Sequence, residues 1–162
     1  MRMKTEILVD KYKNPLYAAA FSACGNPQDA EDAVQESFIR YHSSKKEFEN
    51  EEHIKAWLLR VAINQARDMS RSFFRKNSAA LEDYMETLEF QFPEDRGLFE
   101  TVMGLPEKYR VVLHLYYFED YSVKETAALL SVTEGSVKTR LSRARAMLKE
   151  ILREDWADDD KF

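Results

Sequence analysis

The chain has 162 residues and a formal net charge of −5, with 44% hydrophobic and 33% charged residues. Four Gly and four Pro argue against the many turns of an all-β fold, one Cys excludes an internal disulfide framework, and three scattered His give no zinc motif. The sequence shows neither a signal peptide nor the roughly 20-residue apolar run of a membrane span. We therefore expect a cytoplasmic protein with no membrane insertion, metal or cofactor.

Two Asn-Pro pairs predict helix starts in the N-terminal part of the chain. Asn14–Pro15 has the pattern of an N-cap and first helical turn, and Gly25 is a typical helix stop, so the first helix is expected between them. Asn26–Pro27 repeats the pattern and opens a second helix over about 28–43. The apolar residues recur at helical spacing, so we expect helices only in this half.

Polar faces remain on the second helix and on a third helix over about 53–76. The second helix carries a mainly acidic set: Asp29, Asp32, Gln35, Glu36 and Arg40. The third carries a mainly basic set spaced three or four residues apart, near one face: Arg60, Asn64, Arg67, Asp68 and Arg71. Both faces also fit ordinary solvated surfaces, and Trp57 on the third helix suits core packing better than an exposed role.

The pattern weakens after the third helix. Six acidic residues and no basic one lie between Asn77 and Asp95, so we interpret 77–94 as a flexible acidic linker, with at most a loose helical turn at 84–88. Two helices are expected next, one around 98–103 that ends at Gly104 and one over 106–118. The acidic C-terminal tail is expected to be disordered, with Trp156 as its anchor.

A helix-turn-helix pattern covers the stretch from Tyr121 to Arg153. Ser122 and Glu125 form a capping box, and Thr133 offers a second N-cap after a very short turn. The second helix has one apolar stripe of about five turns: Val137, Leu141, Ala144, Leu148 and Ile151. Two helices joined by a tight turn, the second longer and basic, are typical of a DNA-reading motif.

Charge favours DNA contact over a purely structural helix pair. Residues 122–153 contain seven Lys or Arg against three Glu, in a chain that is acidic overall. Because a protein that binds DNA alone is normally basic, we expect weak free affinity for DNA and a partner that holds the chain there. The sequence contains no Gly-rich phosphate loop, HExxH, GxSxG or CxxC, so we expect no enzymatic activity.

Three segments, in order, resemble a bacterial RNA polymerase sigma factor of the extracytoplasmic-function (ECF) group. They are DAEDAVQESFIRYH at 29–42, IKAWLLRVAINQARDMSR at 54–71, and the long stretch from LPEKYRVV to RARAMLKE at 105–150. The resemblance implies an all-α fold of two small helical domains joined by the acidic linker, the second ending in the helix-turn-helix. The expected divisions are a region-two-like domain at 1–76, the linker at 77–94, a region-four-like domain at 95–154 and an acidic tail at 155–162.

The resemblance implies roles for the exposed faces. It implies that Asp32, Gln35 and Glu36, with Asp29 and Arg40 at the rim, bind the clamp helices of the largest polymerase subunit. The third helix would recognise and open the −10 promoter element through Trp57, Arg60, Asn64, Arg67, Asp68 and Arg71. A flipped base would enter a pocket under the loop at 45–52. The flap of the second subunit is a further expected partner.

The helix-turn-helix would read the −35 element. The implied contacts are Thr133, Glu134, Ser136, Lys138, Thr139, Arg140 and Arg143. The family commonly has Gly in the turn where this chain has Ser131, which costs about 1 kcal/mol if φ must be positive there.

The sequence thus predicts a sigma factor that binds polymerase core and promoter DNA, and an anti-sigma factor is a further candidate partner. Two alternatives stay open. A stand-alone helix-turn-helix regulator would need an N-terminal receiver of alternating strands and helices, which this half lacks. A protein-interaction adaptor would bind acidic partners and show no promoter dependence.

Overall fold

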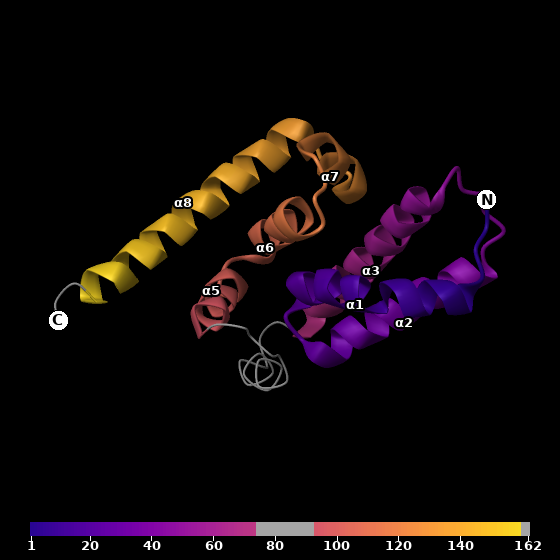
Figure 1. The fold of residues 1–162 in the computed structure, drawn as a ribbon, viewed down its shortest axis with the longest axis horizontal. Helices are drawn as coiled ribbons and strands as arrows, with labels where there is room; N and C mark the ends of the chain where they lie inside the picture. Colours follow the sequence, from indigo (N-terminus) through magenta and orange to yellow (C-terminus); the bar gives the residue numbers. More distant parts are fainter. Residues whose placement is uncertain (74–92, 160–162) are drawn as a thin grey trace. The chain divides into compact units, whose positions relative to one another are not determined.

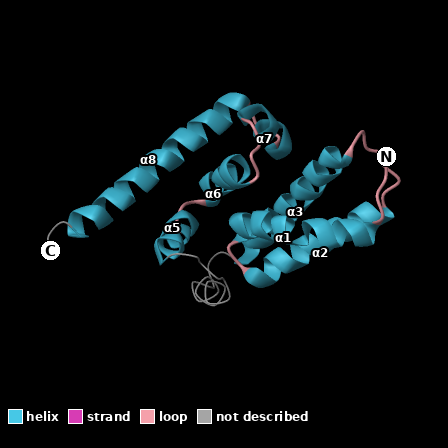
Figure 2. Ribbon diagram, viewed as in Figure 1, coloured by secondary structure: helices cyan, strands magenta, loops and turns pink. Residues whose placement is uncertain are grey.

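The computed structural model describes residues 1–73 and 93–159, and every regular element within these ranges is helical (Figure 1; Figure 2). The chain divides into two compact units, Met1–Leu88 and Glu89–Phe162. The expected all-α class is confirmed. Within the described ranges no helix is both long and apolar enough to cross a membrane. Residues 77–92 of the predicted linker and the last three residues of the tail lie outside the described residues, as do Arg75 and Lys76 of the expected third helix, and residues 93–94 of that linker are helical.

The first unit packs α1 (Thr5–Cys24), α2 (Pro27–Ser43) and α3 (Glu51–Phe73) against one another, each touching the other two. Their shared core is apolar and almost completely shielded from solvent. Its largest almost fully buried side chains are Tyr41, Phe21, Leu8, Leu16, Ile54, Leu58, Leu59 and Ile63. Because every pair of helices meets in this core, the outward faces of α2 and α3 are held in fixed positions.

The expected start of the first helix is wrong, because α1 begins at Thr5 and Pro15 lies inside it. A proline inside a helix lacks the backbone N–H and costs about 3 kcal/mol. Leu8 and Leu16 are 0% exposed, and burying a Leu side chain contributes about 1.5–3 kcal/mol. Their stripe, continued by the buried Tyr12, crosses Pro15, so tertiary packing outweighs the local cost.

The predicted boundary between the first two helices is confirmed, whereas α3 begins at Glu51, two residues before its expected start at about 53. Gly25 ends α1 in the left-handed region, at φ 67°, and its N–H donates to Phe21 O at 2.8 Å. The Asn26 side-chain oxygen accepts the N–H groups of Gln28 and Asp29, with Pro27 at the first helical position. Residue types with one strongly preferred backbone role therefore mark these ends reliably.

The second unit is built from α5 (Pro93–Met103), α6 (Glu107–Leu113), η1 (His114–Phe118), α7 (Val123–Leu130) and α8 (Glu134–Asp159). Both α6 and α7 pack on α8. The expected single helix over 106–118 differs from the structure in its second half, where η1 is a π-helical turn. There the N–H of Glu119 donates to His114 O at 3.2 Å, an i to i+5 bond.

The apolar stripe of α8 is buried only in its first part. Val137 and Ala144 are 0% exposed and Leu141 is 2% exposed, whereas Ile151 is 36% exposed. The helix nevertheless continues to Asp159, so the expected disorder of the tail is wrong for 155–159. A started helix gains one backbone bond for each added residue, and most residue types at 149–157 have good helix propensity.

Candidate nucleic-acid and polymerase interfaces

The first helix of the predicted helix-turn-helix begins at a complete capping box. The N–H of Glu125 donates to Ser122 Oγ at 3.0 Å, and the N–H of Ser122 donates to Glu125 Oε1 at 3.1 Å. The side of α7 that faces the core consists of four buried residues: Thr126, Ala127, Leu129 and Leu130. The predicted start of this motif is therefore confirmed.

The turn between α7 and α8 has the left-handed geometry that usually takes glycine. Ser131 has φ 57° and ψ 43°, and its N–H donates to Ala128 O at 3.3 Å. The N–H of Val132 donates to Ala127 O at 3.0 Å, which completes a Schellman motif. The turn therefore keeps the expected shape, with Ser131 adopting the conformation that glycine would adopt more easily.

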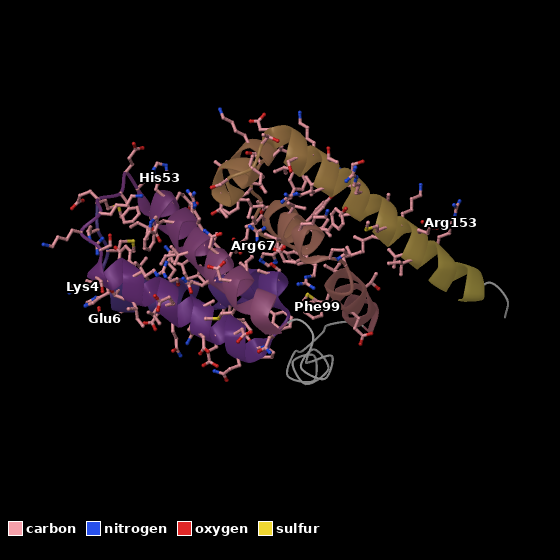
Figure 3. All side chains as sticks on the ribbon, turned by 180° about the vertical axis from the view of Figure 1, so that it is seen from behind. Lys4, Glu6, His53, Arg67, Phe99 and Arg153 are labelled. Carbon is pink, nitrogen blue, oxygen red and sulfur yellow. The ribbon has the colours of Figure 1, made fainter. Side chains whose placement is uncertain are left out.

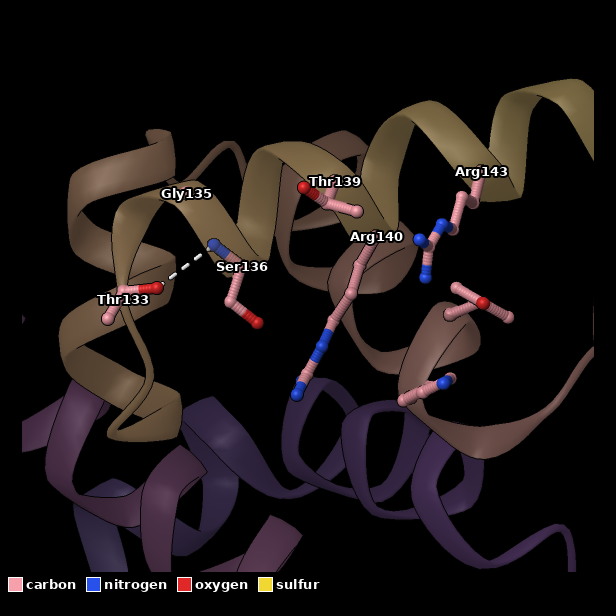
Figure 4. A pocket seen from close by; sticks show the side chains of 8 residues that line it. Thr133, Gly135, Ser136, Thr139, Arg140 and Arg143 are labelled. Carbon is pink, nitrogen blue, oxygen red and sulfur yellow. Dashed lines mark hydrogen bonds between the residues drawn. The ribbon is translucent and has the colours of Figure 1, made fainter.

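Thr133 caps α8, as predicted. Its Oγ1 accepts the N–H of Ser136 at 3.0 Å, and its carbonyl accepts the N–H of Val137 at 3.2 Å (Figure 4). Side chains around this first turn are small or polar, and most are exposed: Thr133, Glu134, Gly135, Ser136, Lys138 and Thr139. Such an end can approach the edges of bases in a major groove without steric conflict.

A hollow of about 360 Å³ lies between the start of α8 and α6 (Figure 4). It brings together five of the seven residues predicted for −35 recognition: Thr133, Ser136, Thr139, Arg140 and Arg143. Glu134 and Lys138 are exposed on the same turns but do not line it. The hollow has three cationic residues, because Lys108 joins the two arginines.

Lys108 and Tyr109 come from α6, and the sequence analysis missed both as site residues. Lys108 is exposed, whereas Tyr109 is 5% exposed and forms a wall. The one available signal was a basic residue in the first turn of a neighbouring helix. Sequence spacing relates residues within one helix, so the contribution of a second helix was not visible.

Arg145 follows on α8 and contacts η1. Its Nε donates to the Tyr117 hydroxyl at 2.6 Å, and its guanidinium lies 5.7 Å from the ring centroid of Tyr116 and 5.6 Å from that of Tyr117. This contact joins the basic helix to the π-helical turn.

The residues predicted for −10 recognition lie along α3. Arg60, Asn64 and Asp68 are exposed. Arg67, which is labelled in Figure 3, is half-buried. Arg71 is on the same helix, with its side chain outside those the structure describes. The spacing of three and four places these positions on neighbouring turns of one side, which suits contact with an extended strand.

Trp57 packs within an aromatic cluster, which favours the core role that the sequence suggested for it. Its ring centroid lies 6.3 Å from that of Tyr41 and 5.9 Å from that of Phe48, both edge to face. The side chain is half-buried. Trp57 therefore joins α3 to the loop at 44–50, and one part of its surface remains accessible.

On α2, Gln35 and Arg40 are exposed and Asp32 and Glu36 are half-buried. Asp32 accepts a hydrogen bond from Gln28 Nε2 at 3.2 Å, and Glu36 accepts one from Arg40 Nε at 2.9 Å. The sequence analysis missed Ile39, which is 58% exposed next to Gln35 and Glu36 on the helical surface. An apolar residue within a polar face was its only sequence signal.

Asp29 lies at the end of this acidic face. Its Oδ2 is buried and has no hydrogen-bond partner. Burial, and then the charge of Asp32, raise the pKa of the Asp29 carboxyl above its ordinary value. A cationic donor from a partner would relieve this arrangement.

Two family matches identify the class of protein to which this chain belongs. The Sigma-70 region 2 family matches residues 8–80, and the Sigma-70 region 4 family matches residues 97–148. The two matched segments correspond to the two units, so the chain has the arrangement of a two-region sigma factor of the sigma-70 type.

Two similar proteins identify the group of sigma factors. The ECF RNA polymerase sigma factor SigW of Bacillus subtilis is 30% identical over 164 residues, covering 91% of this chain and 88% of its own length. SigV of the same organism is 32% identical over 154 residues, covering 91% and 90%. This chain belongs to the ECF sigma factors, a family of non-enzymatic factors that direct promoter recognition and transcription initiation by RNA polymerase.

Solved structures agree with this fold. CnrH in complex with the cytosolic domain of CnrY has a TM-score of 0.66 at 28% identity, covering 93% of this chain and 88% of that one. The sigma factor RpoE in complex with the anti-sigma factor NepR from Bartonella quintana has a TM-score of 0.71 at 23% identity, covering 91% and 96%.

Proposed function

We propose that three exposed faces divide the work of this sigma factor: α2 binds polymerase core, α3 recognises and helps open the −10 element, and the start of α8 reads the −35 element. The observation that carries the proposal is the cationic hollow at the start of α8, in a chain with a net charge of −5. The functional division is the one expected from the sequence, 1–76 and 95–154.

At the −35 element, Arg140 and Arg143 suit guanine edges or phosphates, and Glu134 suits the amino group of cytosine. Thr133, Ser136, Lys138 and Thr139 supply the remaining polar contacts. Lys108 adds a phosphate contact from α6, because it shares the hollow with both arginines.

At the −10 element, Asn64 on α3 suits an adenine edge, and Arg60, Arg67 and Arg71 suit the phosphate backbone of a separated strand. Asp68 lies on the same side and accepts hydrogen bonds. A base that leaves the stack would enter beneath the loop at 45–52, which Trp57 joins to α3.

At the polymerase, Asp32, Gln35 and Glu36 would accept hydrogen bonds from arginines of the clamp helices. Ile39 would supply apolar contact at their centre, and Asp29 and Arg40 would form the rim. The second unit would contact the flap of the second subunit. RpoE was solved in complex with the anti-sigma factor NepR and CnrH in complex with the cytosolic domain of CnrY. An anti-sigma factor would bind this chain in the cytoplasm and hold it away from polymerase.

The test is selection from a randomised promoter library, by purified chain alone and by chain with polymerase core. We expect a two-part motif, with halves about one and a half to two DNA turns apart, recovered only with core. Tight sequence-specific binding by the chain alone would favour a stand-alone regulator. No selection in either arm would favour an adaptor.

Two variants separate the proposed roles. Arg140→Gln should weaken preference in the −35 half by about tenfold and leave the −10 half unchanged, because one base contact carries roughly 1–3 kcal/mol. Asp32→Arg should reduce recovery of both halves together, because it reverses a charge on the core-binding face. The opposite pattern would contradict the assignment.

A further inference from the structure

The first three residues form a strap that lies across the loop joining α2 and α3, at 44–50. The N-terminus lies beside this connection in Figure 1. The strap consists of Met1, Arg2 and Met3. It contacts the end of α2 and the loop, and it lies in the unit that we assign to −10 recognition.

Arg2 holds two parts of the chain together through one guanidinium group. Its Nη1 donates to Lys46 O at 2.8 Å and its Nη2 donates to Tyr41 O at 2.9 Å. The group also lies 4.4 Å from the ring centroid of Tyr41. The planar fork of arginine can bind two carbonyl groups at once, whereas a lysine ammonium is a single point of charge. Arg2 therefore fixes the loop backbone at Lys46 relative to the end of α2.

Tyr41 gives the strap a rigid base. Its side chain is 0% exposed, its hydroxyl donates to Met3 O at 2.8 Å, and the same hydroxyl accepts the Met3 N–H at 2.9 Å. The N–H of Phe48 donates to Met1 O at 3.3 Å. Strap residues on both sides of Arg2 are thus bonded either to the core or to the loop.

The far side of the loop is anchored on α3. Phe48 is 7% exposed, and its ring meets those of Tyr41 and Trp57, with centroids 5.9 Å away in each case. Trp57 precedes Arg60 by three residues. The ring that contacts the loop and the first basic residue proposed for −10 recognition therefore lie on adjacent turns of α3. Between Tyr41 and Phe48 the loop has exposed polar side chains, including Lys45, Lys46 and Glu47.

We propose that Arg2 is a positioning residue for −10 recognition: by bridging Tyr41 O and Lys46 O it holds the loop at 44–50 in the shape that receives the unstacked base. This inference rests on the proposed role of the loop. Arg2 does not need to touch DNA, and its effect is confined to the conformation of the loop.

The first measurement is peptide-resolved hydrogen exchange on the full chain. Arg2→Gln removes the fork and should speed exchange at 44–50 by about tenfold, which corresponds to roughly 1.4 kcal/mol of local stability. Arg2→Lys should give an intermediate effect. Lys4→Gln is the matched control, because it removes one positive charge next to the strap without touching the bonds of Arg2. Unchanged exchange at 44–50 in Arg2→Gln would overturn the proposal.

The second measurement repeats the library selection with core and each variant, after the unfolding temperature has shown that the variant is folded. In the wild type a wrong base at the unstacked position should cost about tenfold, and Arg2→Gln should lower this to about threefold. The −35 half and the affinity for core should not change. A uniform loss over both halves, or a motif identical to the wild type, would overturn the positioning role.

A different result is expected if the proposed role of the loop in −10 recognition is itself wrong. If wild-type holoenzyme selects a −35 half but no −10 half, the role of the loop in base recognition is wrong, and the positioning role falls with it. Hydrogen exchange then reports only that the strap stabilises the loop. Arg2→Lys provides the second folded variant if Arg2→Gln lowers the unfolding temperature of the whole unit.

Discussion

At the scale of single residues, Ser131 carries an identifiable local strain. Its φ of 57° is unfavourable for a residue with a Cβ, and the surrounding Schellman bonds fix it there. Ser131 is exposed to solvent. The stability of the turn between α7 and α8 is therefore below what the same backbone allows.

We expect Ser131→Gly to raise the free energy of unfolding of the second unit by about 0.5–1 kcal/mol. Peptide-resolved unfolding in urea, followed over 123–141, measures this change. Ala128→Gly is the matched control, since Ala128 is exposed inside α7 and the same replacement should cost about 0.5–1 kcal/mol there. A loss of stability in both variants would show that the turn is unstrained.

Helix ends could be predicted from sequence where a residue type has one strongly preferred backbone role. Gly25, Asn26, Ser122 and Thr133 all mark the helix ends that they predicted. Asn14–Pro15 failed, because the same pair is also tolerated inside a helix whose apolar stripe continues on both sides. A local motif cannot report a core that forms from distant residues.

At the scale of elements, η1 contains a histidine that is kept neutral. His114 stacks on Phe118, with ring centroids 5.4 Å apart, and its Nε2 is buried without a hydrogen-bond partner. Burial lowers the pKa of His114 from 6.5 to about 4, opposed by the nearby charge of Glu119. Protonation of this ring is therefore coupled to opening of the π-helical turn.

The sign of the pH effect follows from this shift. The imidazole of His114 takes up a proton near pH 6.5 in the unfolded state and only near pH 4 in the folded state. Its contribution to the free energy of unfolding is therefore constant above this window and decreases as the pH falls through it. The loss should reach about 3 kcal/mol at the lower end. Urea unfolding of 107–118 at pH 7 and pH 4.5, read by pulsed exchange at one fixed pH, measures it.

His114→Gln should remove most of this dependence, and His42→Gln, at an exposed position in the first unit, should leave it as in the wild type. Carboxyl groups titrate in the same window, and their effect is common to all three proteins. Equal slopes in His114→Gln and wild type would show that another group is responsible.

The helices themselves could be predicted from periodicity, but η1 could not. Residues 106–118 have the apolar spacing of one continuous helix, and the contacts of Tyr116 and Tyr117 in the π-helical turn with Arg145 on α8 are tertiary contacts that this spacing does not reveal. In the same way, the predicted apolar stripe of α8 lasts about five turns, whereas Val137, Leu141 and Ala144 are buried and Ile151 is exposed. Coverage by neighbours is a tertiary property.

At the scale of the whole molecule, charge and division into two units lead us to expect that tight promoter binding requires polymerase. The proposed cationic sites are small and lie in an acidic chain, so we expect each half to bind DNA weakly alone. Holding both units on one enzyme makes the second contact intramolecular.

Accordingly, scrambling either half of the selected promoter should lower holoenzyme affinity by about a hundredfold or more, at one fixed salt concentration. Binding by the chain without core should change little, because it makes no coupled contact. Titration of labelled duplexes measures both. Additive, several-fold losses with core would contradict coupling between the units.

Much of the candidate site was predictable, because spacing along one helix assigns residues to one side. Spacing placed the α3 series on one side of its helix, and the family resemblance implied five of the residues that line the hollow: Thr133, Ser136, Thr139, Arg140 and Arg143. Lys108 and Ile39 were missed for different reasons: the first comes from another helix, and the second is an apolar residue whose exposure depends on packing.

The π-helical turn has a further consequence for how the DNA-reading part is aimed. An α-helix advances about 100° per residue, and a π-helical turn accommodates one residue more than an α-helical turn does. The wider turn takes up one residue without shifting the winding that follows it, so a deletion of one residue within His114–Phe118 that restored α-helical winding should leave the direction of α7 and the start of α8 nearly unchanged. The π-helical turn therefore lets this connection hold one residue more than a regular helix of the same phase.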